Sequence, residues 1–314
     1  MMRVAAIDCG TNSIRLLIAD IDPVVGTLTD IARTMTVVRL GEGVDETGGF
    51  SAAALERTFA ACDEYALAIA DAGIDTVRFV ATSASRDVSN RDEFVAGVKA
   101  RLGIEPDVIT GDEEASLSFT GAVRSLGPQV GTRQALVVDI GGGSTEFVRG
   151  SIAEGVTASK SVDIGCVRMT ERRLTANPPT SEQVGAAIED IDAAIQVADA
   201  VVDLRAADVL IGLAGSVTTL AALALELPEY DPAAIHGSEL SATDVFAITN
   251  ALLAMPNEER AELSVMHPGR ADVIGGGALV LDRILASTDV AQVLVSEHDI
   301  LDGIAWSLAN STPN

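Results

Sequence analysis

The 314-residue sequence lacks the features of several common protein classes. Its three cysteines, Cys9, Cys62 and Cys166, are widely spaced and form no CxxC pair. This spacing argues against a disulfide framework and a cysteine zinc site, and it indicates a reducing cytoplasm. Too few apolar residues precede Asp8 for a signal peptide. The longest uncharged run, Val209 to Leu225, contains glycines and hydroxyls, and we interpret it as a buried strand and a helix rather than a membrane span.

Positive charge is also scarce. The formal net charge of −25 argues against general binding to nucleic acid or membrane surfaces, and a polyanionic substrate would need a local positive pocket. Only Lys99 and Lys160 are lysine, so the other basic residues are arginine. Arginine suits bidentate phosphate binding, although a GC-rich genome would produce the same bias. The histidines, at 236, 267 and 298, have no metal-ligand spacing and are predicted to be surface or structural residues. Neither GxxxxGK[ST] nor a full GxGxxG is present, so no P-loop or Rossmann site is supported.

The most informative stretch is LVVDIGGGSTEF, from Leu136 to Phe147. Its pattern predicts a strand, a tight glycine turn and a returning strand. Such a turn can direct several N–H groups at one anion, and the flanking acids Asp139 and Glu146 are the ligand type that a hard divalent cation needs. The alternative is an ordinary hairpin with solvated acids.

A partial echo of this unit lies near the start of the chain, in RVAAIDCGTNSIR, from Arg3 to Arg15. An apolar strand again ends in an acid, Asp8, and a turn of small residues leads to a second apolar run. The turn residues are Gly10, Thr11, Asn12 and Ser13. Two such strand-acid-turn-strand units suggest two related halves that present their turns to one cleft.

The remaining pattern predicts an α/β protein with alternating strands and helices. Strands are expected at about 4–7, 14–19, 34–40, 76–81, 107–109, 151–159, 161–164, 209–213 and 293–295, the first three as an antiparallel meander. Helices are expected at about 52–71, 91–102, 114–123, 165–173, 181–202, 217–225, 242–254, 258–263, 270–286 and 300–309.

Further polar residues stand where strands end or helices begin. Arg86 follows a predicted strand and could contact phosphate or simply lie on the surface. Glu114 begins a helix that leaves the first half of the chain, where it could serve as general base for water, whereas Asp112 and Glu113 can be explained as helix-capping acids. The turn at Gly215 and Ser216 meets a helix N-terminus and suits either an anion or close strand-helix packing. A rare basic cluster contains Arg168, Arg172 and Arg173.

Six motifs together resemble the exopolyphosphatase and guanosine pentaphosphate phosphatase family, over nearly the whole chain and in the correct order. They are DCGTNSIRLLIAD, TSASRD, ITGDEEASLSFTGAV, VVDIGGGSTEF, SVDIGCVRMTERRL and GLAGSVTTLA. The resemblance implies two ribonuclease H-like domains of the actin-like ATPase superfamily with an interdomain active-site cleft. The expected bounds are 1–124, with a C-terminal helix at about 299–314 packing back on it, and 125–298.

By this resemblance, Glu114 occupies the position of the family's catalytic glutamate, and Arg86 matches an arginine that contacts substrate phosphate. Asp139 and Glu146 match its metal and water-positioning acids, and Asp8 is a further candidate metal ligand. The first phosphate loop would contain Asp8, Gly10, Thr11, Asn12 and Ser13, and the second Gly141, Gly142, Gly143, Ser144 and Thr145.

The sequence departs from the family pattern in two places. Cys9 and Thr11 vary the first loop, and Ser296 to Gly303 only partly matches a turn that usually carries arginine. The C-terminal helical domain of longer members is missing, so the chain is most like the short actinobacterial exopolyphosphatases.

The resemblance implies hydrolysis of the terminal phosphoanhydride of inorganic polyphosphate, with Mg²⁺ (or Mn²⁺), by a cytoplasmic homodimer that binds neither nucleic acid nor membrane. Guanosine pentaphosphate hydrolysis shares the same catalytic apparatus. The superfamily also includes ATP-dependent kinases, which would need an adenosine pocket near 275–277, and actin-like modules without turnover.

Overall fold

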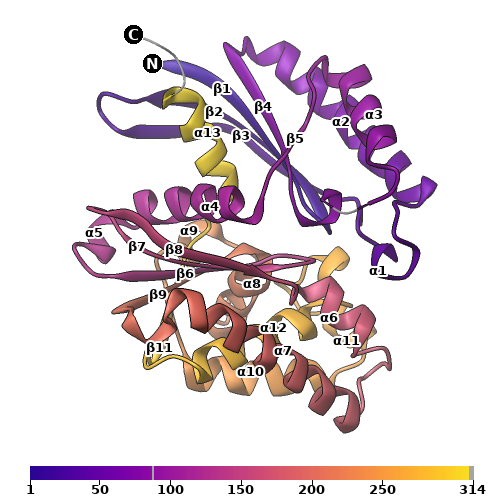
Figure 1. Ribbon diagram of the computed structural model, residues 1–314, viewed down its shortest axis with the longest axis vertical. Coiled ribbons are helices and arrows are strands. Elements are labelled where there is room, and N and C mark those ends of the chain that lie inside the picture. Colours follow the sequence, from indigo (N-terminus) through magenta and orange to yellow (C-terminus); the bar gives the residue numbers. More distant parts are fainter. Residues whose placement is uncertain (87, 311–314) are drawn as a thin grey trace. The chain divides into compact units, whose positions relative to one another are not determined.

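The computed structural model describes residues 1–86 and 88–310 (Figure 1). The chain forms two compact units. Unit 1 comprises Met1–Gly121 and the C-terminal segment that begins at Ile300, and unit 2 is Ala122–Asp299. In the described part of the chain, no helix is long and apolar enough to cross a bilayer.

Unit 1 contains a five-stranded sheet in the order β3-β2-β1-β4-β5. The first three strands are the predicted antiparallel meander, whereas β4 and β5 run parallel to β1. The strands are β1 (Met2–Cys9), β2 (Ser13–Asp22), β3 (Thr27–Val37), β4 (Thr76–Ala81) and β5 (Asp107–Val108).

Helices cover both faces of this sheet, which explains why β1 is apolar at nearly every position. Ala5 and Ile7 belong to the core formed with α2 and α3, whereas Val4 and Ala6 belong to the core that includes α13 (Figure 1). By strand alternation Asp8 lies on the same face as Val4 and Ala6. The helices are α1 (Val44–Thr47), α2 (Ala52–Ala72), η1 (Ser83–Ser85), α3 (Arg91–Leu102), α4 (Gly111–Ser125) and α13 (Ile300–Asn310), and the last turn of α4, from Ala122, belongs to unit 2.

Unit 2 contains a six-stranded sheet in the order β10-β11-β9-β6-β7-β8. Its central strands β6, β9 and β11 are parallel, and β7 and β8 extend one side as antiparallel strands. The strands are β6 (Ala135–Ile140), β7 (Thr145–Ser151), β8 (Gly155–Val162), β9 (Val209–Leu213), β10 (Glu239–Ser241) and β11 (Gln292–Val295).

The main core of unit 2 lies between this sheet and a layer of helices. Val138, Ile140 and Phe147 point into that core, so by strand alternation Asp139 and Glu146 lie on the opposite face of the sheet. The helices are α5 (Gly127–Val130), α6 (Cys166–Arg172), α7 (Ser181–Val202), η2 (Leu204–Ala206), α8 (Ala214–Ala224), α9 (Pro232–Ile235), α10 (Ala242–Ala254), α11 (Asn257–Ala261), η3 (Pro268–Arg270) and α12 (Ile274–Ala286).

The predicted strands at 151–159 and 161–164 are wrong. The chain turns at 152–154 and then forms the single strand β8, from Gly155 to Val162. Gly155 has φ +71°, and the Glu154 N–H donates to the Ser151 side chain at 3.2 Å, so a hairpin turn replaces the expected strand interior. The strand predicted at 34–40 also begins earlier, at Thr27.

Candidate functional site

In unit 1, the predicted first phosphate loop is a tight turn between β1 and β2. The Gly10 N–H donates to the Ser13 carbonyl at 3.0 Å and closes the turn. The Thr11 hydroxyl lies 3.1 Å from that of Ser83, the first residue of η1 after β4. Since β1 and β4 are parallel neighbours, the ends of both strands bring these two hydroxyls together.

The carbonyls of this loop are bound on one side by the segment that follows β3. The Thr11 carbonyl accepts from Gly41 at 2.9 Å, and the Asn12 carbonyl accepts from Val38 and Arg39 at 3.0 and 2.8 Å. In a trans peptide the C=O and the following N–H point in opposite directions. The Asn12 N–H therefore points away from that segment, and within residues 1–86 and 88–310 it donates no hydrogen bond. The loop thus has a backbone donor available for an anion.

Asp8, the acid that precedes this loop, is paired with Arg15. The two residues are directly opposite in the antiparallel register of β1 and β2. Arg15 Nη2 and Nε lie 2.6 and 3.0 Å from Asp8 Oδ2. Asp8 is buried, so this cation compensates its charge within unit 1. Its predicted role as a metal ligand stays a prediction.

The structure brings together two of the predicted catalytic residues, Arg86 and Glu114. Arg86 Nη2 lies 2.6 Å from Glu114 Oε2, although the residues are 28 positions apart. The cause is topological: Arg86 follows β4 and Glu114 follows β5, and the carboxyl ends of these parallel neighbours meet at one edge. Glu114 is buried in the first turn of α4, with its N–H donating to the Thr110 carbonyl at 3.0 Å.

Two contacts that the sequence did not predict fix the helix that carries Glu114. Gly303 of α13 lies against α4 so closely that a Cβ there would be 2.0 Å from the Leu117 carbonyl oxygen. Arg78 binds Glu113 at 2.7 Å and the Ser307 hydroxyl of α13 at 3.0 Å. Both contacts lie inside unit 1, so α13 supports the position of Glu114.

In unit 2, Asp139 and Glu146 face each other across the β6–β7 hairpin. They are direct partners in the antiparallel register, which places both side chains on one face at short range. Both are buried, at 8% and 1% exposure. The hydroxyls of Ser144 and Ser161 each donate to Glu146 Oε1 at 2.7 Å, which fixes the orientation of this carboxyl group.

The glycine turn between these acids is bound from behind by the start of α6. The Gly141 carbonyl accepts from the Cys166 N–H at 2.9 Å, and the Gly142 carbonyl accepts from the Val167 and Arg168 N–H groups at 2.9 and 3.1 Å. The third loop carbonyl, at position 143, accepts from Arg168 Nε at 2.7 Å. All three carbonyls therefore point toward α6.

The peptide N–H groups of the same turn consequently point the other way. These N–H groups belong to Gly142, Gly143 and Ser144, and in the described part of the chain they donate no hydrogen bond. Gly165 makes the arrangement possible, because a Cβ there would lie 2.3 Å from the Gly142 backbone. Three convergent backbone donors form an anion cradle, and Thr145 anchors its far end by donating to the Ile164 carbonyl at 2.8 Å.

A third small-residue turn begins α8, beside the glycine turn. Leu213 pairs with Asp139 in the parallel register, so α8 starts next to the end of β6. Ala214 adopts φ +67°, which is unusual for a residue with a side chain. A Cβ at Gly215 would lie 2.1 Å from the Arg270 guanidinium carbon. Arg270, which the sequence did not single out, thus lies against the turn.

The remaining basic and histidine predictions have mixed outcomes. Of the predicted basic cluster, Arg168 binds the glycine turn, whereas Arg173 forms an exposed ion pair with Asp190 at 2.6 Å. His236 and His298 have ring centroids 4.8 Å apart despite their separation in sequence. Over residues 1–86 and 88–310, no group of three or more His, Cys, Asp or Glu side chains forms a metal site.

The predicted site residues thus form two groups. Unit 1 holds Asp8, the loop Gly10–Ser13, Arg86 and Glu114, and unit 2 holds Asp139, the loop Gly141–Thr145 and Glu146. The expectation that both groups face one cleft stays a prediction.

Comparison with known families decides what these motifs belong to. The Ppx/GppA phosphatase family matches residues 17–312. The chain belongs to this family. Membership confirms the family predicted from the motifs, and it makes the protein an enzyme of the phosphatase type.

Individual relatives of this Ppx/GppA family member agree over nearly their full length. Exopolyphosphatase 2 of Mycobacterium tuberculosis (strain H37Rv) is 49% identical over 320 aligned residues, which cover 98% of this chain and 99% of that protein. A solved exopolyphosphatase-like protein has a TM-score of 0.94 and 44% identity, with 98% of this chain and 97% of that chain covered. The Ppx/GppA enzyme of Aquifex aeolicus has a TM-score of 0.81 and 33% identity, with coverage of 98% and 99%. These similarities confirm the predicted actin-like, ribonuclease H-like α/β fold.

Proposed function

We propose that this chain is an exopolyphosphatase, which hydrolyses the terminal phosphoanhydride of inorganic polyphosphate and releases orthophosphate. The observation that carries the proposal is the Gly141–Thr145 turn, whose carbonyls are bound by α6 while three N–H groups remain for an anion beside two buried acids. The similarity to Exopolyphosphatase 2 of Mycobacterium tuberculosis supports the choice of substrate.

In the proposed reaction, the two loops hold the terminal phosphoryl group through backbone N–H groups and hydroxyls. The N–H groups of Gly142, Gly143 and Ser144 serve in unit 2, and the Asn12 N–H and the Thr11 hydroxyl serve in unit 1. Such preorganised donors stabilise the charge on the equatorial oxygens during in-line transfer.

Glu114 acts as general base for the attacking water. Water oxygen forms a bond to the terminal phosphorus, its proton passes to Glu114, and the bridging P–O bond breaks. The shortened chain leaves with the electron pair. Arg86, at 2.6 Å from Glu114, would orient this carboxylate and contact a substrate phosphate.

Asp139 and Glu146 fit a divalent cation, because they are buried carboxylates that face each other on one side of the sheet, and carboxylate oxygens are the ligands such an ion prefers. We propose that they hold Mg²⁺ (or Mn²⁺). When bound, the ion would neutralise charge on the phosphate oxygens. Asp8 remains a candidate third ligand, although Arg15 already compensates its charge.

The proposal also takes from the family a division into two ribonuclease H-like domains, at 1–124 with about 299–314 and at 125–298. We also propose that the protein is a cytoplasmic homodimer that binds neither nucleic acid nor membrane. Analytical ultracentrifugation of the purified chain tests the dimer.

The deciding experiment measures kcat/KM for phosphate release from long polyphosphate, short polyphosphate and guanosine pentaphosphate, with and without Mg²⁺. We expect long polyphosphate to have the largest value and all release to depend on the ion. A larger kcat/KM for guanosine pentaphosphate would show that guanosine pentaphosphate, and not polyphosphate, is the preferred substrate. ATP consumption that requires an added sugar or acid acceptor would indicate a kinase.

A further inference from the structure

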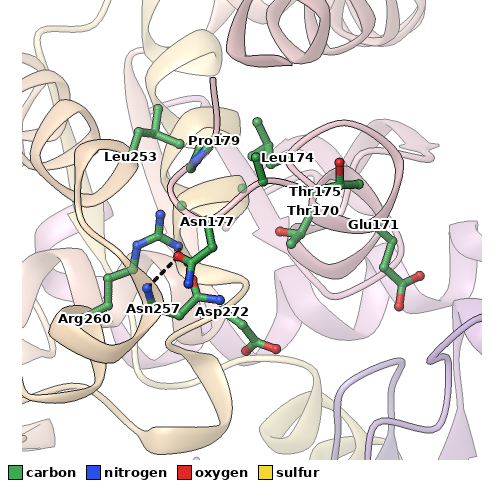
Figure 2. A pocket seen from close by; sticks show the side chains of 13 residues that line it. Thr170, Glu171, Leu174, Thr175, Asn177, Pro179, Leu253, Asn257, Arg260 and Asp272 are labelled. Atoms are coloured by element: carbon green, nitrogen blue, oxygen red, sulfur yellow. Dashed lines mark hydrogen bonds between the residues drawn. The ribbon is translucent and has the colours of Figure 1, made fainter. Parts of the chain in front are cut away.

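A pocket of about 260 Å³ lies within unit 2, and none of the phosphate-loop residues lines it. Its walls come from the end of α6 and the loop after it, from α10 and α11, and from the start of α12 (Figure 2). Small-molecule pockets typically measure ~300–1,000 Å³, so this one suits a ligand smaller than a drug-sized molecule.

The feature that distinguishes this pocket is a buried arginine. Arg260 lines it and is only 3% exposed. Its Nε donates to the Leu252 carbonyl at 2.7 Å, and its Nη1 donates to Asn257 Oδ1 and the Ala271 carbonyl at 3.2 and 3.3 Å. All these acceptors are neutral. Within the described residues, Nη2 makes no hydrogen bond and no carboxylate lies within 4.0 Å of the guanidinium.

A buried charge that is not paired is costly, and neutral acceptors compensate it only in part. Burial lowers the pKa of Arg260, although the negative charge of Asp272 opposes this shift. Nη2 therefore offers N–H donors to an anionic group inside the pocket.

Acids line another part of the same pocket. Asp272 is half-buried just before α12, and Glu171 is exposed near the end of α6 (Figure 2). Arg260 is the one basic side chain among the lining residues, and this lining suits a ligand with a single anionic group better than a phosphate chain. The two carboxylates would attract a positively charged group on the ligand.

The remaining walls are apolar or carry no side chain. Leu174, Leu253 and Pro179 contribute hydrocarbon surface, as Figure 2 shows. Gly275 keeps the space in front of the arginine open, because a methyl group there would lie 3.2 Å from Leu253 Cδ2 and 3.4 Å from Arg260 Nη1. The pocket thus combines one buried cation, two acids and an aliphatic wall.

We propose that this pocket binds a small zwitterion of the α-amino-acid type with an aliphatic side chain. The ligand carboxylate binds Arg260 Nη2, its ammonium group lies toward Asp272 and Glu171, and its side chain packs on Leu174 and Leu253. The proposal does not depend on polyphosphate hydrolysis, because it concerns binding to residues outside the proposed catalytic groups.

Isothermal titration calorimetry of the full chain tests this proposal, with L-leucine as the probe. Two analogues each lack one charge: 4-methylpentanoate has no ammonium group and 3-methylbutylamine has no carboxylate. We expect L-leucine to bind one site per chain and each analogue to bind at least about tenfold more weakly, since one charge-assisted hydrogen bond is lost. Absence of L-leucine binding at millimolar concentration, or equal binding of an analogue, would overturn the proposal.

Variants locate the binding site. Asp272→Asn should weaken the binding of L-leucine about tenfold, because the partner of the ammonium group is gone. The difference in affinity between L-leucine and 4-methylpentanoate should therefore become smaller. Glu259→Gln, an exposed neighbour of Arg260 that does not line the pocket, should leave binding unchanged. Gly275→Ala should weaken the binding of every ligand, because the added methyl group fills the space in front of Arg260.

These variants avoid replacing Arg260 itself, whose loss could unfold the α10–α11 connection. If Asp272→Asn and Gly275→Ala both bind L-leucine as the unchanged protein does, the ligand binds elsewhere and the proposal is wrong. If ATP or orthophosphate binds instead of L-leucine and Gly275→Ala abolishes that binding, the pocket is a phosphate-ligand site and the ligand class is wrong.

Discussion

In unit 1 the acid before the phosphate loop faces an arginine, whereas in unit 2 the corresponding acid faces a second acid. Asp8 is paired with Arg15 at 2.6 Å across β1 and β2. Asp139 stands opposite Glu146 at the same kind of position in β6 and β7. The loops share one backbone plan, with carbonyls bound on one side and N–H groups turned to the other.

This difference suggests that the two loops have different tasks, phosphate binding in unit 1 and cation binding in unit 2, although their sequences are similar. A loop whose acid is already neutralised can bind a phosphate anion without help from an ion. A loop flanked by two buried carboxylates that face each other is suited to hold a divalent cation, since carboxylate oxygens are the ligands such an ion prefers. We therefore expect the proposed cation to depend mainly on the acid pair of unit 2, with Asp8 as the weaker candidate ligand, and unit 1 to supply the proposed general base with its arginine.

The largest effect should come from Glu114 of unit 1. Glu114→Gln should reduce kcat for phosphate release about 10²–10⁴-fold with little change in KM, because it removes the proton acceptor but keeps the side chain's shape. Steady-state kinetics on polyphosphate measures this. Glu64→Gln is the matched control, since Glu64 is exposed on α2, and this variant should retain nearly full activity. Equal losses of kcat in both variants would show that Glu114 is not the general base.

The backbone plan of the unit 2 loop is tested at Gly165. Gly165→Ala would place a methyl group 2.3 Å from the Gly142 backbone, so the turn must shift and its N–H groups with it. We expect kcat/KM to fall about 10²-fold, as expected when oxyanion donors are misplaced. Gly185→Ala on α7, where the added methyl group meets open space, should keep full activity and a similar melting temperature by circular dichroism. Activity retained in Gly165→Ala would show that the loop is not the phosphate cradle.

Internal pairing of acids in unit 1 predicts a smaller effect on stability. Asp302 of α13 is buried at 2% exposure and binds Arg33 at 2.6 Å. Asp302→Asn should lower the free energy of unfolding by about 1–3 kcal/mol, because Arg33 loses its buried partner. Asp30→Asn removes the exposed partner of the same arginine and should cost less than about 1 kcal/mol. Urea unfolding compares the two, and similar costs would show that burial of the pair is unimportant.

The smallest predicted effect is a difference in reactivity between Cys9 and Cys166, the cysteines beside the two loops. Burial raises the pKa of Cys9 well above its ordinary value of 9.0. Burial also raises the pKa of Cys166, although the Ser216 hydroxyl and the charge of Arg270 oppose the shift. Both thiols are therefore protonated at neutral pH, and labelling should be slow until the pH rises beyond about 9. Iodoacetamide labelling followed by peptide mass spectrometry should modify Cys166 before Cys9, and the reverse order would contradict these environments.

Much of the fold could be predicted because its signals are local. The strand Thr76–Ala81 and the helix Ala242–Ala254 agree with the predicted ranges, since apolar periodicity and caps lie within each segment. The Ser151–Gly155 turn was missed because it has no glycine pair or proline, and only its positive φ and serine contact reveal it.

The site was predictable in its residue types but not in its pairings. The Asp8–Arg15 pair could have been found from the hairpin register, since a turn at Gly10–Ser13 places the two residues opposite each other. The pairing of Arg86 with Glu114 depends on which parallel strands are neighbours, and the packing of Gly303 on Leu117 joins segments far apart in sequence. Only three-dimensional structure supplies such long-range contacts.

A Mg²⁺ titration of hydrolysis in Asp139→Asn and Asp8→Asn compares the two loops directly. If the cation belongs to unit 2, Asp139→Asn should raise the Mg²⁺ concentration for half-maximal activity at least about tenfold, which corresponds to ~1.4 kcal/mol of lost binding energy. Asp8→Asn should lower activity while leaving that concentration within about twofold of its original value, a change of ~0.4 kcal/mol. Equal shifts in the two variants, or a shift only in Asp8→Asn, would contradict the assignment of the cation to the acid pair of unit 2.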